Sequence, residues 1–457
     1  MKTTPDIPIA DLRADLNGSV IGPYDPGYDL ARGVFFTGFD RRPAAIVRAA
    51  DASEVARVVN FARETGVEVA VLSGGHSRAG HGTSEGGIVL DLSEMNAVEI
   101  DAESRTAWAQ PGVKGGDYTR ATGEHGLATG LGDTASVGVG GITLGGGVGF
   151  LVRKNGLTID DVLGAEVVTA DGELLRVDEA SHPDLFWALR GGGGNFGVVT
   201  GLRFRLHEID DVVGGMLVLP ASVEVIDGLV AAAEAAPEEL SVIANVTKAP
   251  PMPFIPAKAH GTPIVIALMV YAGDAEPGER AIAPIRALAT PLADMVRPIR
   301  YPQMYEGPEG PRPAASAGTN VLVDSLAPGA AEAILEHLET STAQMAGVQL
   351  RVLGGAMARV SEAATAFGHR GAKMMVNVAA MYESPDEGPE HEAWARSLVT
   401  ALGDGSAAYV GFLADEGEEG VRRAYPPATL ERLADVKRRY DPDNLFRLNL
   451  NVAPVGP

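Results

Sequence analysis

The densest run of glycine in the chain, "GDTASVGVGGITLGGGVGF" at residues 132–150, restricts what the backbone can form there. Glycine costs roughly 1 kcal/mol per helical site relative to alanine, so the run predicts neither a regular helix nor a regular strand. The apolar residues between the glycines argue against disorder; they are Val137, Val139, Ile142 and Leu144. We therefore expect a segment that wraps closely around a bound group.

Two further glycine loops lie at the ends of expected strands, "SGGHSRAGHG" at 73–82 and "RGGGGNFG" at 190–197. Bare backbone N–H groups in such loops bind phosphate without lysine. The second loop contains G-x-G-x-x-G, but a helix precedes it and a strand follows it, which is the reverse of a dinucleotide-binding turn. "GHSRA" at 75–79 nearly matches the hydrolase elbow G-x-S-x-G, but the glycines after it disfavour the helix that this motif needs. One such loop alone reads as a tight turn, whereas several together favour a phosphate-bearing cofactor.

Strands and helices alternate around these loops. The segment 53–66 predicts an amphipathic helix with Ser53 as N-cap, Gly66 as its end and one apolar stripe, formed by Val55, Val58, Val59 and Ala62. Composition changes near 208–215, and 216–412 reads as a second α+β unit. The other expected elements are strands at 44–50, 67–73 and 87–93, hairpins at 98–110 and 165–177, helices at 115–126 and within 182–190, a strand after 197, and a final helix followed by an Asp-Pro turn and a polar strand.

Composition narrows the class of protein. The 457 residues, 46% of them hydrophobic, predict two or three domains. A net charge of −23 argues against a nucleic-acid partner and against an anionic membrane surface. The absence of cysteine excludes disulfides, iron–sulfur clusters and cysteine nucleophiles, and His76 and His81 lack the carboxylates that a metal site would need. Neither a signal peptide nor a membrane span is evident, so we expect a cytoplasmic protein.

Four segments taken together resemble the berberine bridge enzyme-like flavoproteins of the vanillyl-alcohol oxidase superfamily. They are "SGGHSRAGHG", "VGVGGITLGGGVGFLVRKNGLTID", "HPDLFWALRGGGGNFGVVT" and "YDPDNLFRLNLNV". The resemblance implies an α+β fold with a PCMH-type FAD-binding domain of two subdomains. It also implies a substrate domain whose antiparallel sheet, covered by helices, roofs the flavin. The implied domains are 1–210 for FAD, 211–412 for substrate, and 413–457 returning to the FAD domain.

By this resemblance His76 is bonded through its ring to the 8α-methyl of FAD. A neutral imidazole is a nucleophile near pH 7, which suits that bond; a histidine satisfied by loop hydrogen bonds is the alternative. Many relatives carry a second bond from a cysteine, and Thr134 stands at that place here. Because the chain has no cysteine, we expect a monocovalent flavoprotein.

The resemblance also assigns further cofactor contacts. Val137, at the position of the family's oxygen gate, is small, which favours an oxidase using O₂ over a dehydrogenase. The tail contact is the weakest, because Leu450 replaces the glutamine of the family's N-Q-N. The expected contacts are Leu72, Ser73, Gly74, Gly75, Ser77 and His81 around the pyrophosphate, Val137, Gly138, Gly141 and Ile142 along the isoalloxazine, Val198 at the adenine end, and Asn449 and Asn451 in the tail.

The resemblance makes Tyr409, in "YVGF", the candidate base for a small-molecule alcohol, sugar or amine. A useful tyrosine base needs a nearby cation or hydrogen bond to lower its pKa, and Arg351, Arg370 and Lys373 are possible donors. A tyrosine that only orients substrate is the alternative. Gln349, Asn377 and His369 are candidate substrate contacts, although ordinary sheet surface is the competing interpretation. An oxidase leads; a dehydrogenase with another acceptor and a non-redox cyclase or flavin-binding protein remain alternatives. The oligomeric state is left open.

Overall fold

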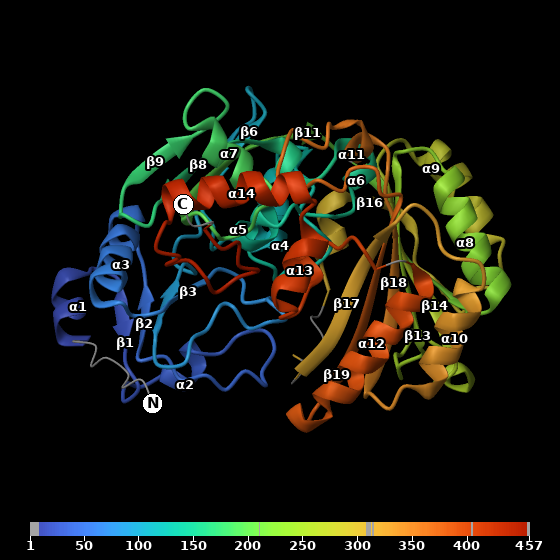
Figure 1. Ribbon diagram of the computed structural model, residues 1–457. Coiled ribbons are helices and arrows are strands. Elements are labelled where there is room, and N and C mark those ends of the chain that lie inside the picture. Colours follow the sequence, from blue (N-terminus) through green and yellow to red (C-terminus); the bar gives the residue numbers. More distant parts are fainter. Residues whose placement is uncertain (1–8, 210, 308–311, 313–314, 404, 455–457) are drawn as a thin grey trace.

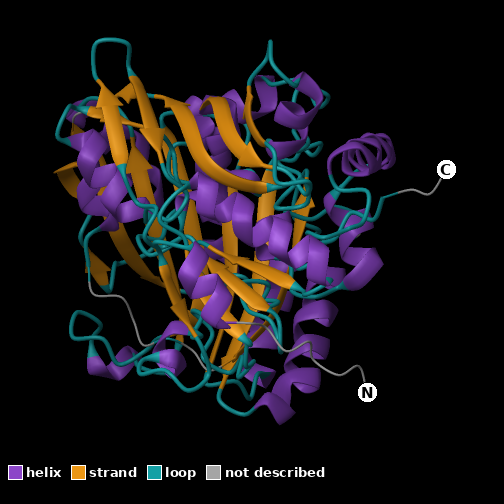
Figure 2. Ribbon diagram, turned by 90° about the vertical axis from the view of Figure 1, so that its left-hand side faces the viewer, coloured by secondary structure: helices purple, strands orange, loops and turns teal. Residues whose placement is uncertain are grey.

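The computed structural model describes residues 9–209, 211–307, 312, 315–403 and 405–454. Its architecture is α+β, as expected, with two smaller sheets in the N-terminal half and one large antiparallel sheet on the right of Figure 1. Viewed from the side, helices lie between and outside the strand layers (Figure 2). Within these residues, no helix is both long enough and apolar enough to cross a lipid bilayer.

The first sheet has the strand order β1-β2-β4-β3. β2 and β3 run parallel to β4, and α3 (Ala52–Thr65) connects β2 to β3. The expected stripe of α3 is fully buried, and Gly66 ends the helix with φ 69°. The N-cap is Asp51 rather than Ser53, because the Asp51 carboxylate accepts the Glu54 N–H. The strands are β1 (Ser19–Ile21), β2 (Ala45–Arg48), β3 (Val69–Leu72) and β4 (Ile88–Asp91).

The second sheet is antiparallel with the order β5-β6-β10-β8-β9, and both expected hairpins lie in it. A two-stranded pair, β7 with β11, lies beside it. The strands are β5 (Val98–Asp101), β6 (Thr106–Ala109), β7 (Leu127–Ala128), β8 (Val162–Val168), β9 (Leu174–Val177), β10 (Val198–Arg205) and β11 (His207–Glu208). The helices of this half are α1 (Ile9–Asp15), α2 (Tyr28–Ala31), α4 (Gly115–Gly123), α5 (Val139–Leu144), α6 (Val152–Asn155), α7 (Pro183–Leu189) and the short η1 (Thr158–Asp161).

The glycine-rich run contains the short helix α5, so the expectation of no regular helix there is wrong over six residues. Packing explains the difference. A Cβ on Gly140 would lie 2.8 Å from the Cβ of Pro111, so a glycine at this position lets the helix approach that residue closely. Close packing outweighs the intrinsic helix penalty of glycine.

The large sheet has the order β15-β12-β14-β13-β18-β19-β17, with β16 paired to β12. Helices α8 (Val223–Ala235), α9 (Ala275–Arg286), α10 (Ala330–Thr340) and α12 (Gly388–Leu402) pack against it and form one hydrophobic core with its strands (Figure 1). The strands are β12 (Asp211–Pro220), β13 (Leu240–Lys248), β14 (Pro263–Tyr271), β15 (Ala293–Asp294), β16 (Arg297–Arg300), β17 (Ala315–Val323), β18 (Met345–Val352) and β19 (Met374–Tyr382). Short helices α11 (Ala356–Arg359), η2 (Ala257–Ala259), η3 (Tyr301–Tyr305), η4 (Pro385–Glu387) and η5 (Val410–Phe412) lie in its connections.

The C-terminal part returns to the N-terminal half. Helix α14 (Pro427–Tyr440) follows α13 (Gly417–Ala424) and packs against α7 (Figure 1). The expectation of a polar strand after α14 is wrong. The backbone groups of this tail are hydrogen-bonded by side chains instead of by a neighbouring strand. Asp441 accepts the N–H groups of Leu445 and Phe446, and Asn195 bonds both Leu450 O and Val452 N.

A buried lysine fixes this tail. Lys437 Nζ lies 2.6 Å from the Asp441 carboxylate and also donates to the carbonyls of Asn195 and Phe446. Both charged side chains are fully buried.

The domain boundaries expected from the sequence, at 210 and 412, stay a prediction.

Candidate active site

A cavity of about 480 Å³ lies where the glycine loops, the large sheet's connections and the C-terminal tail meet. We call it the central cavity. Its wall is formed by residues within 69–82, 132–148, 193–199, 409–414 and 446–450, together with Phe35, Phe36, Leu92, Pro111, Met381 and Tyr425. Pockets of this size, built from loops at strand ends, are typical of small-molecule and cofactor sites.

Two of the glycine loops cross in direct contact. A Cβ on Gly74 would lie 2.2 Å from Gly138 N, and one on Gly138 would lie 2.2 Å from Ser73 Oγ. Only glycine at both positions allows this approach, which brings the backbone of both loops to the cavity. Gly141 and Gly194, also in the wall, have nothing within 4 Å of a built Cβ, so their backbone faces open space. A cradle of this kind suits a flat cofactor that carries phosphates.

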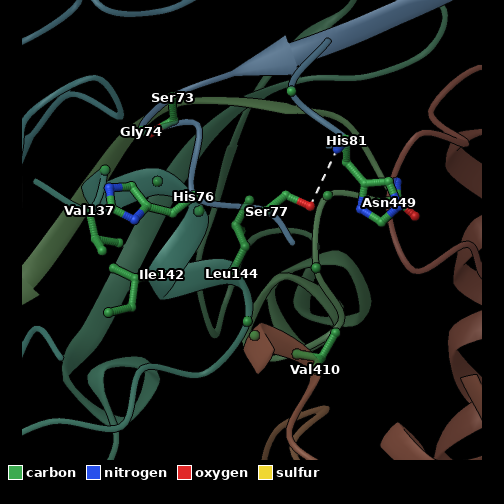
Figure 3. Close-up of a pocket in the computed structure, with 18 of the residues that line it drawn as sticks. Ser73, Gly74, His76, Ser77, His81, Val137, Ile142, Leu144, Val410 and Asn449 are labelled. Carbon is green, nitrogen blue, oxygen red and sulfur yellow. Dashed lines mark hydrogen bonds between the residues drawn. The ribbon is translucent and has the colours of Figure 1, made fainter. Parts of the chain in front are cut away.

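His76 lies in the wall beside Val137 and Ile142 (Figure 3). The ring of Phe35 stacks on its imidazole with centroids 4.1 Å apart and an interplanar angle of 23°. Its Nε2 lies 3.1 Å from Ser136 Oγ. These two contacts fix the plane and the rotation of the imidazole.

A second histidine, His81, lies near Asn449 in Figure 3, where Ser77 Oγ accepts its backbone N–H. Burial lowers the pKa of the His81 imidazole to about 4, so it is neutral at physiological pH. Asn449 donates to Phe446 O, whereas its Oδ1 is buried without a partner among the described residues. A buried amide oxygen in a cavity wall is expected to have a hydrogen-bond donor, and a bound ligand can supply one.

Most of the residues proposed from the sequence line the central cavity. They are Leu72, Ser73, Gly74, Gly75, His76, Ser77, His81, Thr134, Val137, Gly138, Gly141, Ile142, Val198, Tyr409 and Asn449. Asn451 is outside this wall, although its Oδ1 is also buried without a partner in the described part of the chain.

The three candidate substrate contacts do not line the central cavity. His369 bonds the Arg423 carbonyl, so its imidazole serves a loop contact. Gln349 in β18 and Asn377 in β19 lie outside the wall, and within the described residues only Asn377 of the pair is hydrogen-bonded to a wall residue, Arg78. There Gln349 accepts from Arg351 and Asn377 accepts from Arg78.

Tyr409 lies in the wall with its hydroxyl oxygen 3.0 Å from the Gly147 N–H that donates to it. Burial raises the pKa of Tyr409 above its usual value; the Gly147 N–H and the positive charge of Arg351 oppose this shift only in part. The cation and the hydrogen bond that a tyrosine base would need are thus both present, but desolvation outweighs them. Tyr409 is protonated at neutral pH and presents a hydroxyl rather than a phenolate.

Arg351, one of the cations considered for Tyr409 from the sequence, does lie near it; sequence reasoning missed the carboxylate partner of Arg351 and the second arginine beside it, Arg78. Arg351 pairs with Asp133 at 2.5 Å, and Arg78 and Arg351 lie on the ring of Phe412 at 5.5 and 5.0 Å. Of these, Arg78, Asp133 and Phe412 line the central cavity. Phe35 was missed as well. The only signal was proximity to known motifs, since Asp133 precedes Thr134 and Arg78 follows "GGHS"; Phe35 has no local signal.

Comparisons with known proteins agree with this geometry. A family model described as "FAD binding domain" matches residues 43–178, and one described as "Berberine and berberine like" matches 408–453. (R)-6-hydroxynicotine oxidase of Paenarthrobacter nicotinovorans is 33% identical, covering 96% of this chain and 98% of that protein.

Solved structures give the same result. The crystal structure of 6-hydroxy-D-nicotine oxidase from Arthrobacter nicotinovorans superposes with a TM-score of 0.86 at 30% identity, covering 96% of this chain and 98% of that one. Xylooligosaccharide oxidase from Myceliophthora thermophila, solved with xylobiose, gives 0.85 at 26% identity over 98% and 100%. The glycine loops form a cradle that suits FAD, the fold matches solved flavoenzymes, and a relative is similar over nearly the full length of both chains. The chain therefore belongs to the berberine bridge enzyme-like family of FAD-linked oxidoreductases.

Proposed function

We propose that this protein is an oxidase that removes a hydride from a C–H group of a small alcohol, sugar or amine and uses O₂ as the final acceptor. The observation that carries the proposal is the glycine cradle at Gly74 and Gly138, which converges with an oriented His76 and with Tyr409 on one cavity. FAD, when bound, would supply the two-electron acceptor: the substrate would lose one hydride and one proton, and O₂ would take up the same two electrons and two hydrogens as H₂O₂.

The cradle residues would hold FAD through main-chain donors. The crossed loops at Gly74 and Gly138 bring backbone N–H groups to the cavity, and the unpartnered Oδ1 of Asn449 can accept a hydrogen bond from the cofactor. His81 is neutral, so it can donate one ring N–H without bringing in a charge. This set of groups fits FAD.

We further propose that one covalent bond joins FAD to His76. Phe35 and Ser136 hold the imidazole in a fixed orientation, which shortens the search for a reactive geometry. Thr134 stands where relatives carry a second linking cysteine and bonds Asp133 through its hydroxyl. With no cysteine in the chain, one bond is the maximum.

Tyr409 would orient the substrate as a hydrogen-bond donor. Its oxygen already accepts from Gly147, and its own O–H is directed by that contact. A protonated phenol stabilises charge developing on a substrate oxygen or nitrogen by about 1–3 kcal/mol when buried. This role replaces the general base expected from the sequence.

The first experiment separates the cofactor from its bond. The purified protein is precipitated with acid, and flavin is measured in the washed pellet and in the supernatant. Flavin in the pellet of the wild type, but in the supernatant for His76→Ala, supports the single bond. Flavin released from both proteins would refute the bond and leave the fold assignment unchanged.

A second experiment tests the oxidase. A panel of alcohols, sugars and amines is screened anaerobically for bleaching of the flavin, and air is then admitted. Rapid return of colour with H₂O₂ supports an oxidase, with Val137 as the residue beside which O₂ approaches. Slow return indicates a dehydrogenase, and no bleaching across the panel indicates a non-redox protein.

A further inference from the structure

A second guanidinium, that of Arg78, faces the central cavity and is not used in the function proposed above. Arg78 follows the loop that carries His76, but its side chain reaches across to the large sheet. Its Nη1 donates to Asn377 Oδ1 in β19 at 3.2 Å and lies 2.5 Å from a Cβ built on Gly318 of β17. The group therefore lies on the substrate-domain side of the cavity rather than among the crossed loops.

Arg78, in the cavity wall, and its neighbour Arg351, which does not line the cavity, differ in their charge balance. Arg351 pairs with the Asp133 carboxylate and also donates to Gln349 and to the carbonyl of Val148. Arg78 has no carboxylate within 4 Å among the residues described, and Asn377 is its one hydrogen-bond acceptor there. Its further contact is the ring of Phe412.

Arg78 remains charged. Burial, helped by repulsion from Arg351, lowers its pKa to about 10, which still leaves it a cation at neutral pH. Arg78 is partly buried, and a partly buried cation without a counter-charge is costly in a folded protein; such costs are concentrated at ligand sites. Its planar fork has five N–H donors, and a carboxylate matches two of them side by side.

We propose that Arg78 binds a carboxylate carried by the substrate, so that the substrates of this enzyme are carboxylate-bearing alcohols or amines. This inference rests on the proposed function. Asn377 acts as a positioning residue, because it holds the guanidinium against the sheet. The ring of Phe412, with Arg78 on it, forms an apolar surface for the carbon skeleton next to the carboxylate.

The test uses the flavin-loaded protein and a matched pair of probes, benzoate and benzamide, which differ mainly in charge. Binding is followed by calorimetry and by the shift of the visible flavin spectrum. We expect benzoate to bind the wild type about 10- to 100-fold more tightly than benzamide, the range expected for a charge-assisted fork. Equal affinities in the wild type would overturn the proposal without any variant.

Two substitutions locate the effect. Arg78→Gln should weaken benzoate about 10- to 100-fold and change benzamide less than about threefold. Arg78→Lys, which keeps the charge but loses the fork, should fall between. The matched control is Arg57→Gln on the exposed face of α3, which removes one positive charge far from the cavity and should leave both affinities unchanged.

Two further outcomes of the Arg78 substitutions also decide whether the proposal holds. If Arg78→Gln lowers flavin retention while a benzoate preference persists, Arg78 serves the cofactor and the proposal is overturned. If Arg78→Gln does not fold, Arg78→Lys decides: an undiminished benzoate preference overturns the proposal and a reduced one supports it. The binding assay needs no turnover, so failure of the oxidase assignment would appear in the anaerobic screen and not here.

Discussion

Replacing Tyr409 by phenylalanine tests how this cavity handles its substrate. The substitution removes the acceptor of a buried Gly147 N–H, so the free energy of unfolding should fall by about 1–3 kcal/mol. It also removes the hydroxyl that we place against the substrate. A transition-state hydrogen bond of about 1.4–2.8 kcal/mol corresponds to a rate of flavin reduction lower by about 10- to 100-fold.

The assay is anaerobic stopped-flow reduction with a substrate found in the panel. The control is Tyr118→Phe, which loses a comparable buried hydroxyl contact, with Thr129, but does not line the central cavity. It should lose similar stability and keep the reduction rate. An unchanged rate in Tyr409→Phe, with normal flavin content, would refute the role of the hydroxyl.

The pH profile separates a hydroxyl donor from a phenolate base. Burial raises the pKa of Tyr409, so its deprotonation should not appear below its ordinary value of about 10. We therefore expect no step in the wild-type reduction rate between pH 7 and 9 that Tyr409→Phe abolishes. Such a step would show that the phenolate acts, as the sequence alone had indicated.

Three further predictions concern stability and cofactor retention. Lys437→Met leaves the buried Asp441 carboxylate without its cation, so the free energy of unfolding measured in denaturant should fall by about 3–5 kcal/mol. A loss below about 1 kcal/mol would show that the buried Lys437–Asp441 pair does not stabilise the tail. Because the folded pKa of His81 is depressed to about 4, the unfolded state binds more protons between pH 6.5 and 4. The free energy of unfolding of the flavin-free protein should therefore fall by up to about 3 kcal/mol as the pH drops from 6.5 to 4. His81→Gln should make this pH dependence less steep. An unchanged pH dependence in His81→Gln would contradict the prediction. Gly138→Ala places a Cβ 2.2 Å from Ser73 Oγ, so purified protein should carry markedly less flavin than the wild type; full flavin loading would mean that the crossed loops tolerate separation.

The sequence predicted the elements well where the signal was local. The stripe of α3, both hairpins of the second sheet and the glycine loop before β10 depend on residues next to one another in the chain. The misses arose where a distant partner decides. The tail after Asp441 is irregular because Asn195, more than 200 positions earlier, takes its backbone groups.

The candidate site likewise contains residues that local motifs identify and properties that only the folded cavity determines. His76, Gly74 and Gly138 are recognisable from their motifs and lie together in the cavity wall. The raised pKa of Tyr409 could not be read from the sequence, because it is set by burial within the assembled wall. The contrast between Arg78 and Arg351 was equally invisible, since it depends on which of them lies within reach of Asp133.

The buried Lys437 and the tail that it holds also determine when the central cavity can be completed during folding. The wall of the central cavity is assembled from residues as early as Phe35 and as late as Leu450. Before the segment 409–450 has folded back, the cavity wall lacks Tyr409 and Asn449. The hydrogen bond from Lys437 to the Asn195 carbonyl is also still absent. The complete wall of the central cavity therefore forms only after the segment 409–450 has been made and has folded back against the glycine loops.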